Sequence, residues 1–311
     1  MTDITDMHDV HDRTIKALLL VNGKGKRMFE MGLVSKDDWL ANFVLNHFDR
    51  NEFINLESDK TKLLLDFVAT LCVDPELLSF PPDFDPSATY ILTVEIDWKR
   101  IFANYFKYSS YFLTLVREYF LKNKLKLFFF VIYGINVNPS EKEQEIASRI
   151  SSDLLTVRII YLSQTDRKQL LESVHEKLEK GQLPENLDIV RLAYLPALTD
   201  KLNKAKNPGA ANKENEKIFC PSAFQDMLIC VKIANKFKDI ADNVSTLFHK
   251  AITLLHWNRL TESQKESIAK ESQLMKEYAE TFYEWMDRTV NEARLEAKKE
   301  AKKEAEKEAE K

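Results

Sequence analysis

Leu92-Thr93-Val94-Glu95-Ile96-Asp97-Trp98-Lys99 is the stretch of sequence on which the expected fold depends. Apolar residues occupy every second position, and polar residues fill the positions between them. Successive side chains of a strand point to opposite faces, so this alternation predicts a strand with one packed face and one polar face. Glu95, Asp97 and Lys99 would share the polar face, at steps of about 7 Å.

The residues after this stretch predict the rest of an α/β unit. Tyr105–Phe120 carries aromatic residues at helical spacing, and Lys126–Tyr133 is a nearly continuous apolar run, typical of a strand covered on both faces. Thr156–Leu162 has the composition of a third strand, and Asp166–Lys180 that of a helix stopped by Gly181. This order predicts an α/β domain over residues 1–200.

The residues before the alternating stretch are expected to be helical and then extended. Apolar residues from Trp39 to Phe48 recur at helical spacing, and Leu63–Val73 is a second helix candidate. The segment Phe80–Pro86 contains three prolines, which favour extended or turn structure.

The C-terminal third of the chain divides into a linker, a helical region and a tail. Residues 201–217 form a polar linker with Pro208-Gly209 near its middle, and residues 218–290 have helical periodicity. The apolar face of this region is too large for one exposed helix. It must pack on the first domain, on its own helical hairpin, or on a second protomer in a homodimer. Residues 291–311 repeat Glu, Ala and Lys, which predicts a solvated helical tail.

Net charge, cysteine content and the distribution of apolar residues argue against several classes of protein. The net charge of −4 provides no overall attraction to nucleic acid, and three cysteines are too few and too scattered for a disulfide framework or a zinc site. Residues 1–6 lack the features of a signal peptide, and the most apolar run, Leu125–Ile135, is too short to cross a bilayer. A cytoplasmic protein without a membrane partner is therefore expected.

Three features follow one another between Asp12 and Asp200. The first is the segment His11–Leu19, and the second is Pro82-Asp83, or Asp85-Pro86, ahead of Val94–Asp97. The third is the aromatic helix, the apolar strand ending in Ile132-Tyr133-Gly134, and the strand–Asp–helix unit Val157–Lys177. In this order they resemble the PD-(D/E)xK nuclease superfamily, in particular its recombination-promoting nuclease and transposase-like branch.

The resemblance implies both a fold and an activity. The fold would be α/β, a restriction-endonuclease-like mixed sheet flanked by helices and followed by an all-helical C-terminal arm. The activity would be Mg²⁺- or Mn²⁺-dependent hydrolysis of DNA, linked to mobile elements or defence. Asp83 or Asp85 and Glu95 would hold the metal, and Lys99 would orient water or the scissile phosphate.

The sequence departs from the family pattern at Asp97, where the family has Lys or Gln. Asp97 could be a third metal ligand, or it could mark an inactive nuclease fold that serves as a binding or assembly module. Two further interpretations stay open. The polar positions could be the solvated face of an edge strand, or the chain could be an α/β interaction protein unrelated to nucleases.

Overall fold

The computed structural model describes residues 25–49, 53–55, 62–64, 67–73, 89–97, 125–134, 141–150, 155–206, 218–272 and 274–276, together with positions 15, 17–19, 21 and 22. Several parts of the chain on which predictions were made lie outside the described residues. Among them are Phe80–Pro86, Trp98-Lys99, the helix expected over Tyr105–Phe120, most of the linker, and residues 277–311.

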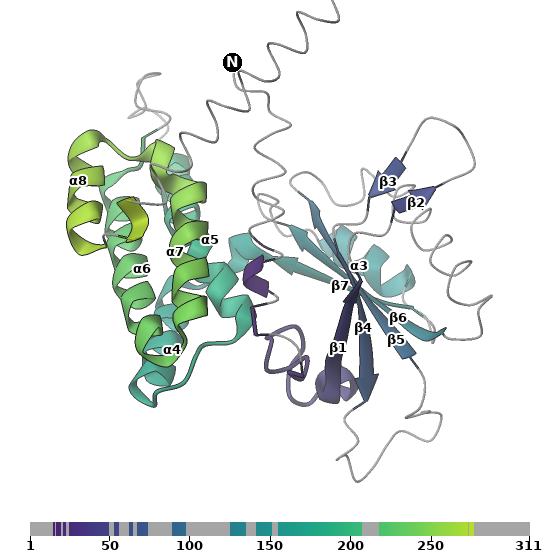
Figure 1. Ribbon diagram of the computed structural model, residues 1–311. Helices are drawn as coiled ribbons and strands as arrows, with labels where there is room; N and C mark the ends of the chain where they lie inside the picture. Colours follow the sequence, from purple (N-terminus) through teal and green to yellow (C-terminus); the bar gives the residue numbers. More distant parts are fainter. Residues whose placement is uncertain are drawn as a thin grey trace, which may run out of the picture.

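The described strands form a five-stranded sheet and a separate two-stranded ribbon (Figure 1). The strands are β1 (Phe43–Asp49), β2 (Phe53–Asn55), β3 (Lys62–Leu64), β4 (Phe67–Val73), β5 (Thr89–Asp97), β6 (Leu125–Gly134) and β7 (Leu155–Tyr161). The large sheet has the order β1-β4-β5-β6-β7, and β2 pairs with β3. β4 is antiparallel to both of its neighbours, β1 and β5, whereas β5, β6 and β7 are parallel to one another.

The three strands predicted from residue 92 onward are confirmed as β5, β6 and β7. β6 lies between two parallel neighbours, which explains its nearly continuous apolar sequence. Two of the helices predicted before residue 80, over Trp39–Phe48 and Leu63–Val73, are wrong. Residues 39–48 form a short 3₁₀ turn, η1 (Trp39–Asn42), followed by β1, and residues 63–73 contribute to β3 and β4. Short apolar runs do not separate a strand from a helix by periodicity, and here β1–β4 pairing decides.

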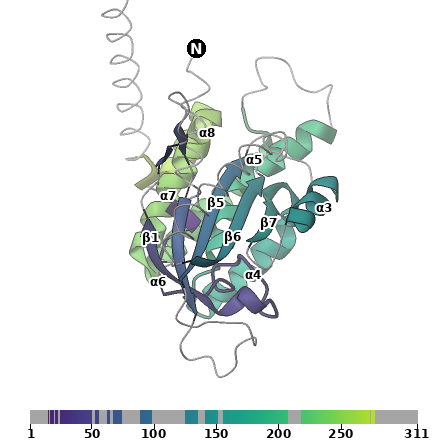
Figure 2. The same ribbon diagram turned by 90° about the vertical axis from the view of Figure 1, so that its right-hand side faces the viewer.

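The described helices gather beside the sheet. The longer ones are α3 (Glu141–Ile150), α4 (Arg167–Glu179), α5 (Asn186–Lys206), α6 (Pro221–Ile240), α7 (Asp242–His256) and α8 (Glu262–Glu271), with 3₁₀ turns η4 (Leu162–Gln164) and η5 (Trp257–Arg259). α3 lies against β7, whereas α4 to α8 form a bundle on one side of the sheet (Figures 1 and 2).

α5 is the centre of this bundle. It is buried around nearly its whole circumference from Asn186 to Leu198, and both α6 and α7 pack on it. Pro196 inside the helix has no N–H for the carbonyl of Leu192. The thiol of Cys230 on α6 donates to that carbonyl at 3.3 Å, and Nε2 of His256 on α7 donates to the next one, of Ala193, at 2.6 Å. Neighbouring helices therefore complete the interrupted turn.

The fold class implied by the resemblance is wrong. A mixed sheet is present, but the described residues are mostly helical, and α4 to α8 pack on one another instead of flanking the two faces of a sheet. The helical region is also part of a bundle with α4 and α5, and not an arm, because α5 is buried on nearly all sides by the helices that pack on it. α5 crosses residue 200, and the division of the chain into units at that point stays a prediction.

One continuous hydrophobic core joins the helices to the sheet. Phe43 of β1 and Tyr90 of β5 meet edge to face at 4.7 Å, and both belong to the cluster that includes Phe237 and Phe248 of the bundle. Leu202 is the one large hydrophobic side chain that is exposed among those the structure describes. The apolar face of α6 and α7 is therefore covered within the chain. No helix in the described ranges has the length and apolar character needed to cross a membrane.

Candidate functional site

The parallel strands β5, β6 and β7 end together at one edge of the sheet. Asp97, the last residue of β5, pairs with Gly134, the last of β6, and Gly134 pairs with Tyr161, the last of β7 (Figure 2). With neighbouring strands about 4.8 Å apart, these three chain ends span about 10 Å. In open sheets with parallel strands, ligands bind outside the carboxyl ends of the strands. This carboxyl edge is therefore the candidate site.

Two of the predicted site residues are at this edge. Asp97 is the last residue of β5. Glu95 lies two residues before it and pairs with Ile132 of β6. The other three, Asp83, Asp85 and Lys99, lie outside the described residues. The convergence of Asp83 or Asp85 with Glu95 therefore stays a prediction. Within the part of the chain that the structure describes, no three His, Cys, Asp or Glu residues are grouped so that they could hold a metal ion.

The start of α4 is fixed at the same edge by local signals in the sequence. β7 ends at Tyr161 and leads through η4 into α4. Thr165 Oγ1 donates to the Leu162 carbonyl at 2.7 Å, and the Asp166 carboxylate accepts from the amides of Lys168 and Gln169 at 2.8 and 3.0 Å. Asp166 is thus an N-cap, and it fixes where the helix begins.

An ion pair with a buried carboxylate then attaches this helix start to the bundle. Arg167, the first residue of α4, donates from Nε to Asp226 Oδ1 of α6 at 2.8 Å, and its terminal nitrogen lies 2.6 Å from the same oxygen. Thr199 of α5 donates to Oδ2 of Asp226 at 2.6 Å. The side chain of Asp226 is fully buried, whereas that of Arg167 is 50% exposed. The hydrogen bond with Asp226 raises the pKa of Arg167, so the guanidinium stays charged.

A second buried carboxylate, Asp200 on α5, organises the other end of the bundle. It accepts hydrogen bonds from Arg259, from Lys204 at 2.8 Å and from the backbone amide of Cys220 at 3.0 Å. The Arg259 guanidinium also lies 4.3 Å from the centre of the Phe219 ring. Burial acts to raise the pKa of Asp200, but these donors and the charges of Arg259 and Lys204 outweigh it, so the pKa is lowered and the group is ionised.

Asp200 and Asp226 are the acidic residues that sequence reasoning missed. Both are buried with each carboxylate oxygen already occupied, so neither is free to bind a metal or to act as a base. The partners Arg167 and Arg259 are each 59 residues away along the chain, so no local pattern could have paired them. The available signal was an aspartate close to apolar residues of its helix, Leu198 near Asp200 and Met227 beside Asp226, because a buried carboxylate needs a partner.

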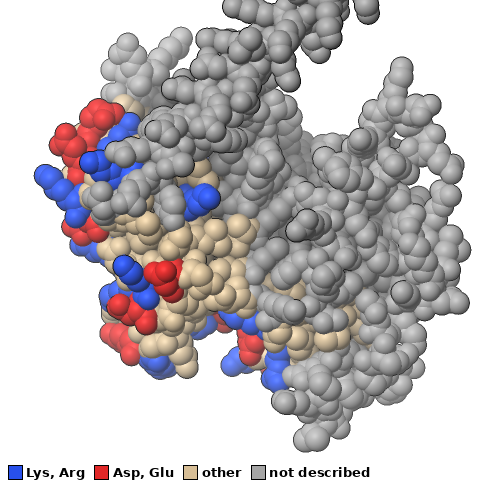
Figure 3. Space-filling view, viewed as in Figure 1, with Lys and Arg blue, Asp and Glu red and all other residues tan. Residues whose placement is uncertain are grey.

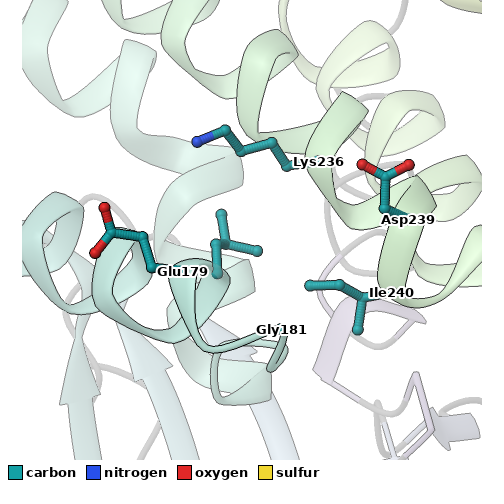
Figure 4. Close-up of a pocket in the computed structure, with 6 residues that line it drawn as sticks. Glu179, Gly181, Lys236, Asp239 and Ile240 are labelled. Atoms are coloured by element: carbon teal, nitrogen blue, oxygen red, sulfur yellow. The ribbon is translucent and has the colours of Figure 1, made fainter.

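A surface pocket of about 540 Å³ lies between the end of α4 and the end of α6. It is lined by Leu178, Glu179, Gly181, Lys236, Asp239 and Ile240. Figure 4 shows Lys236 and Ile240 extending from α6 toward the α4 side of the opening. The charged lining residues are exposed and of both signs, so this pocket offers no concentrated field to a charged ligand.

The described helical surface is also mixed in charge. On the face shown in Figure 3, lysines and arginines alternate with acidic residues over the described helices, without a patch of one sign on that part of the face. Several of these charges pair along α4, as Lys180 with Glu176 at 2.6 Å and Lys168 with Glu172 at 3.7 Å. Such pairs are a solvated helix surface, and they do not form the basic stripe expected of a nucleic-acid interface.

No protein-family profile, no curated protein sequence and no solved structure matches this chain.

Proposed function

We propose that this chain hydrolyses phosphodiester bonds in DNA with Mg²⁺ or Mn²⁺, and that Glu95 is a metal ligand. The observation that supports the proposal is the position of Glu95 and Asp97. They close β5 at the edge where three parallel strands end, and they are separated by one residue. Two carboxylates at such an edge have the hard oxygen donors that these cations prefer.

The residues have distinct roles in this proposal. Glu95 and Asp97 hold the cation from β5, and Asp83 or Asp85 supplies a further carboxylate. When bound, the cation activates water and neutralises charge on the phosphoryl oxygens. Lys99 orients the water or the phosphate. Asp97 stands where the resemblance implies Lys or Gln. The side-chain ammonium that orients the water or the phosphate therefore comes from Lys99, two residues further along.

Plasmid cleavage tests the proposal directly. The purified full chain should nick supercoiled DNA when Mg²⁺ or Mn²⁺ is added, and Glu95→Gln should abolish nicking because it removes the charge while keeping the shape. Glu172→Gln on the exposed face of α4 is the matched control and should leave nicking unchanged. Thermal melts should show that Glu95→Gln is as well folded as the parent. Nicking that survives Glu95→Gln at full rate would remove Glu95 from the mechanism.

A second candidate function is that of a binding or assembly module on an inactive nuclease-like chain. The observation in its favour is Asp97, which stands where an active member of the family would have Lys or Gln. Calorimetry with Mn²⁺ distinguishes the two candidates. A Glu95-dependent binding heat supports the metal enzyme, whereas the absence of such a heat, together with the absence of nicking, supports the assembly role.

A further inference from the structure

His249 on α7 is a buried histidine whose two ring nitrogens both face oxygen atoms. Its side chain is 2% exposed. Nδ1 lies 2.9 Å from the backbone carbonyl oxygen of Ser245, one helical turn earlier. Nε2 lies 3.2 Å from Oδ1 of Asn235 on α6. The Ser245 hydroxyl is 3.4 Å from Nδ1, but it donates to the Ala234 carbonyl at 2.8 Å and so supplies no proton to the ring.

The orientation of Asn235 is set by its other partner. Asn235 Nδ2 lies 3.2 Å from the carbonyl oxygen of Glu271, the last residue of α8, and a carbonyl can only accept. The amide oxygen of Asn235 must therefore face the imidazole. A neutral imidazole carries one N–H and an imidazolium carries two. The two contacts of His249 and the Asn235–Glu271 bond can all be hydrogen bonds only when the ring is doubly protonated.

A neutral ring breaks this chain of bonds at a predictable point. The shorter contact, to the Ser245 carbonyl, retains the proton on Nδ1, which leaves a lone pair on Nε2 facing the oxygen of Asn235. The Asn235 amide then turns so that Nδ2 donates to Nε2. Its oxygen now faces the Glu271 carbonyl, and the hydrogen bond to the end of α8 is lost.

We propose that His249 is a proton-operated latch, which holds the end of α8 through Asn235 when the ring is protonated and releases it when the ring is neutral. The latch acts on the end of α8 and on the described residues that follow it. Just beyond α8, the Ser272 amide donates to the Ile268 carbonyl at 2.9 Å, and the buried Met275 donates its amide to Ser272 Oγ at 3.3 Å. The state of His249 therefore decides how firmly residues 271–276 are attached.

The surroundings of His249 set the pH range of the latch. Burial lowers the pKa of His249 below the usual 6.5, the hydrogen bond with the Ser245 carbonyl acts to raise it, and the charge of Lys238 on α6 lowers it. Among the described residues, Lys238 is the charged group that acts on the ring; α8 contributes the Glu271 carbonyl, through Asn235. The latch closes as the pH falls below 6.5.

The closing of the latch and the overall stability have opposite pH dependences, which makes the latch measurable. Because the pKa of His249 is lowered in the folded chain, the unfolded chain binds more protons below pH 6.5, so the free energy of unfolding falls there. The latch predicts that local opening at the end of α8 nevertheless becomes rarer on acidification. Global destabilisation would make every amide exchange faster, so increased protection confined to residues 268–276 has the latch as its cause.

Hydrogen–deuterium exchange of the full chain between pH 4.5 and 8, corrected for intrinsic exchange rates, tests the proposal. Peptides covering residues 268–276 should gain about two- to tenfold protection on acidification, the range expected for one hydrogen bond. The gain should follow the protonation of His249 seen by NMR. Asn235→Ala, an exposed position that should not affect folding, should abolish the gain, as should His249→Phe. The exposed His175 of α4 provides the control, because His175→Gln should leave it unchanged.

Two results would overturn the latch. One is protection of residues 268–276 that does not change with pH in the parent chain. The other is the same gain in the parent and in Asn235→Ala, which would place its cause elsewhere.

Discussion

The helical bundle and the carboxyl edge of the sheet place acidic residues in opposite ways. In the bundle, Asp200 and Asp226 are buried, and each is surrounded by cationic and neutral donors that occupy its oxygens. At the sheet, Glu95 and Asp97 lie at the end of β5, between the antiparallel β4 and the parallel β6. Burial of a carboxylate is therefore a poor guide to chemistry in this chain. The proposed site depends instead on the position of Glu95 and Asp97 at the end of parallel strands.

The bundle and the carboxyl edge are also expected to contribute differently to stability and activity. Removing one partner of a buried ion pair leaves a charge without compensation, whereas a residue that serves a ligand contributes little to folding. Variants in the bundle should therefore change stability, and variants at the carboxyl edge should change activity.

The largest effect is expected at the Arg167–Asp226 pair. Arg167→Met should lower the free energy of unfolding by about 3–5 kcal/mol, because Asp226 is fully buried and would lose both contacts with the guanidinium. Urea denaturation measures the loss. The double variant Arg167→Met with Asp226→Leu should be more stable than Arg167→Met alone, since it removes the uncompensated charge. A double variant that is less stable than either single variant would show that the pair is more than an electrostatic match.

The interrupted turn of α5 gives the second prediction. Cys230→Val should cost about 1–2 kcal/mol, because the Leu192 carbonyl loses the thiol that donates to it where Pro196 has no amide. Burial raises the pKa of the Cys230 thiol, so the thiol is a donor at every working pH, and the cost should not vary with pH. Pro196→Ala supplies an amide donor and should reduce the cost of Cys230→Val in the same melts. An unchanged cost would show that the amide does not reach Leu192.

These two cases show why the bundle was harder to predict from sequence than the strands. β5, β6 and β7 could be predicted because alternation and apolar runs are local patterns, and α4 because Asp166 and Gly181 are local boundary signals. Gly181 has a φ of +67°, a left-handed conformation that glycine adopts at little cost. The contacts of Asp226 and of the Leu192 carbonyl involve residues 27 to 59 positions apart, which no local pattern specifies.

The failures before residue 80 and at the level of the fold class have one cause. Residues 39–48 and 63–73 carry apolar residues whose spacing fits a helix, yet β1 and β4 pair with each other along most of their length. Pairing with a neighbouring strand therefore decides that these residues form strands and not helices. In the same way, the bundle forms because α6 and α7 pack on α5. The order of the elements along the sequence, from which the fold class was predicted, does not specify this packing. For the site, the sequence predicted Glu95 and Asp97 on one strand, and the two buried ion pairs were missed.

The third prediction concerns a local signal within the bundle. Thr261 caps α8, and Thr261 and Gln264 form a reciprocal capping box, with contacts of 3.3 and 2.9 Å. Thr261→Ala should cost about 1 kcal/mol in thermal or urea melts, because an amide at the start of the helix loses its acceptor. Thr261→Ser keeps the oxygen and should cost much less. Equal losses in the two variants would mean that the methyl group, and not the cap, is responsible.

The smallest effect is expected at the end of the sequence. Truncation after Arg294 removes the Glu/Ala/Lys repeat, in which no large apolar residue follows Leu295. Surface pairs of such a repeat contribute only about 0.2–0.5 kcal/mol each, so the melting temperature should stay within about 2 °C of the parent. Truncation after Glu216 is the contrasting variant. It removes α6, α7 and α8 and uncovers α5, whose buried surface would then face water, so this variant should aggregate. A soluble and equally stable chain ending at Glu216 would show that the sheet and α5 do not need the bundle, and that the continuous core joining the two regions contributes nothing to folding.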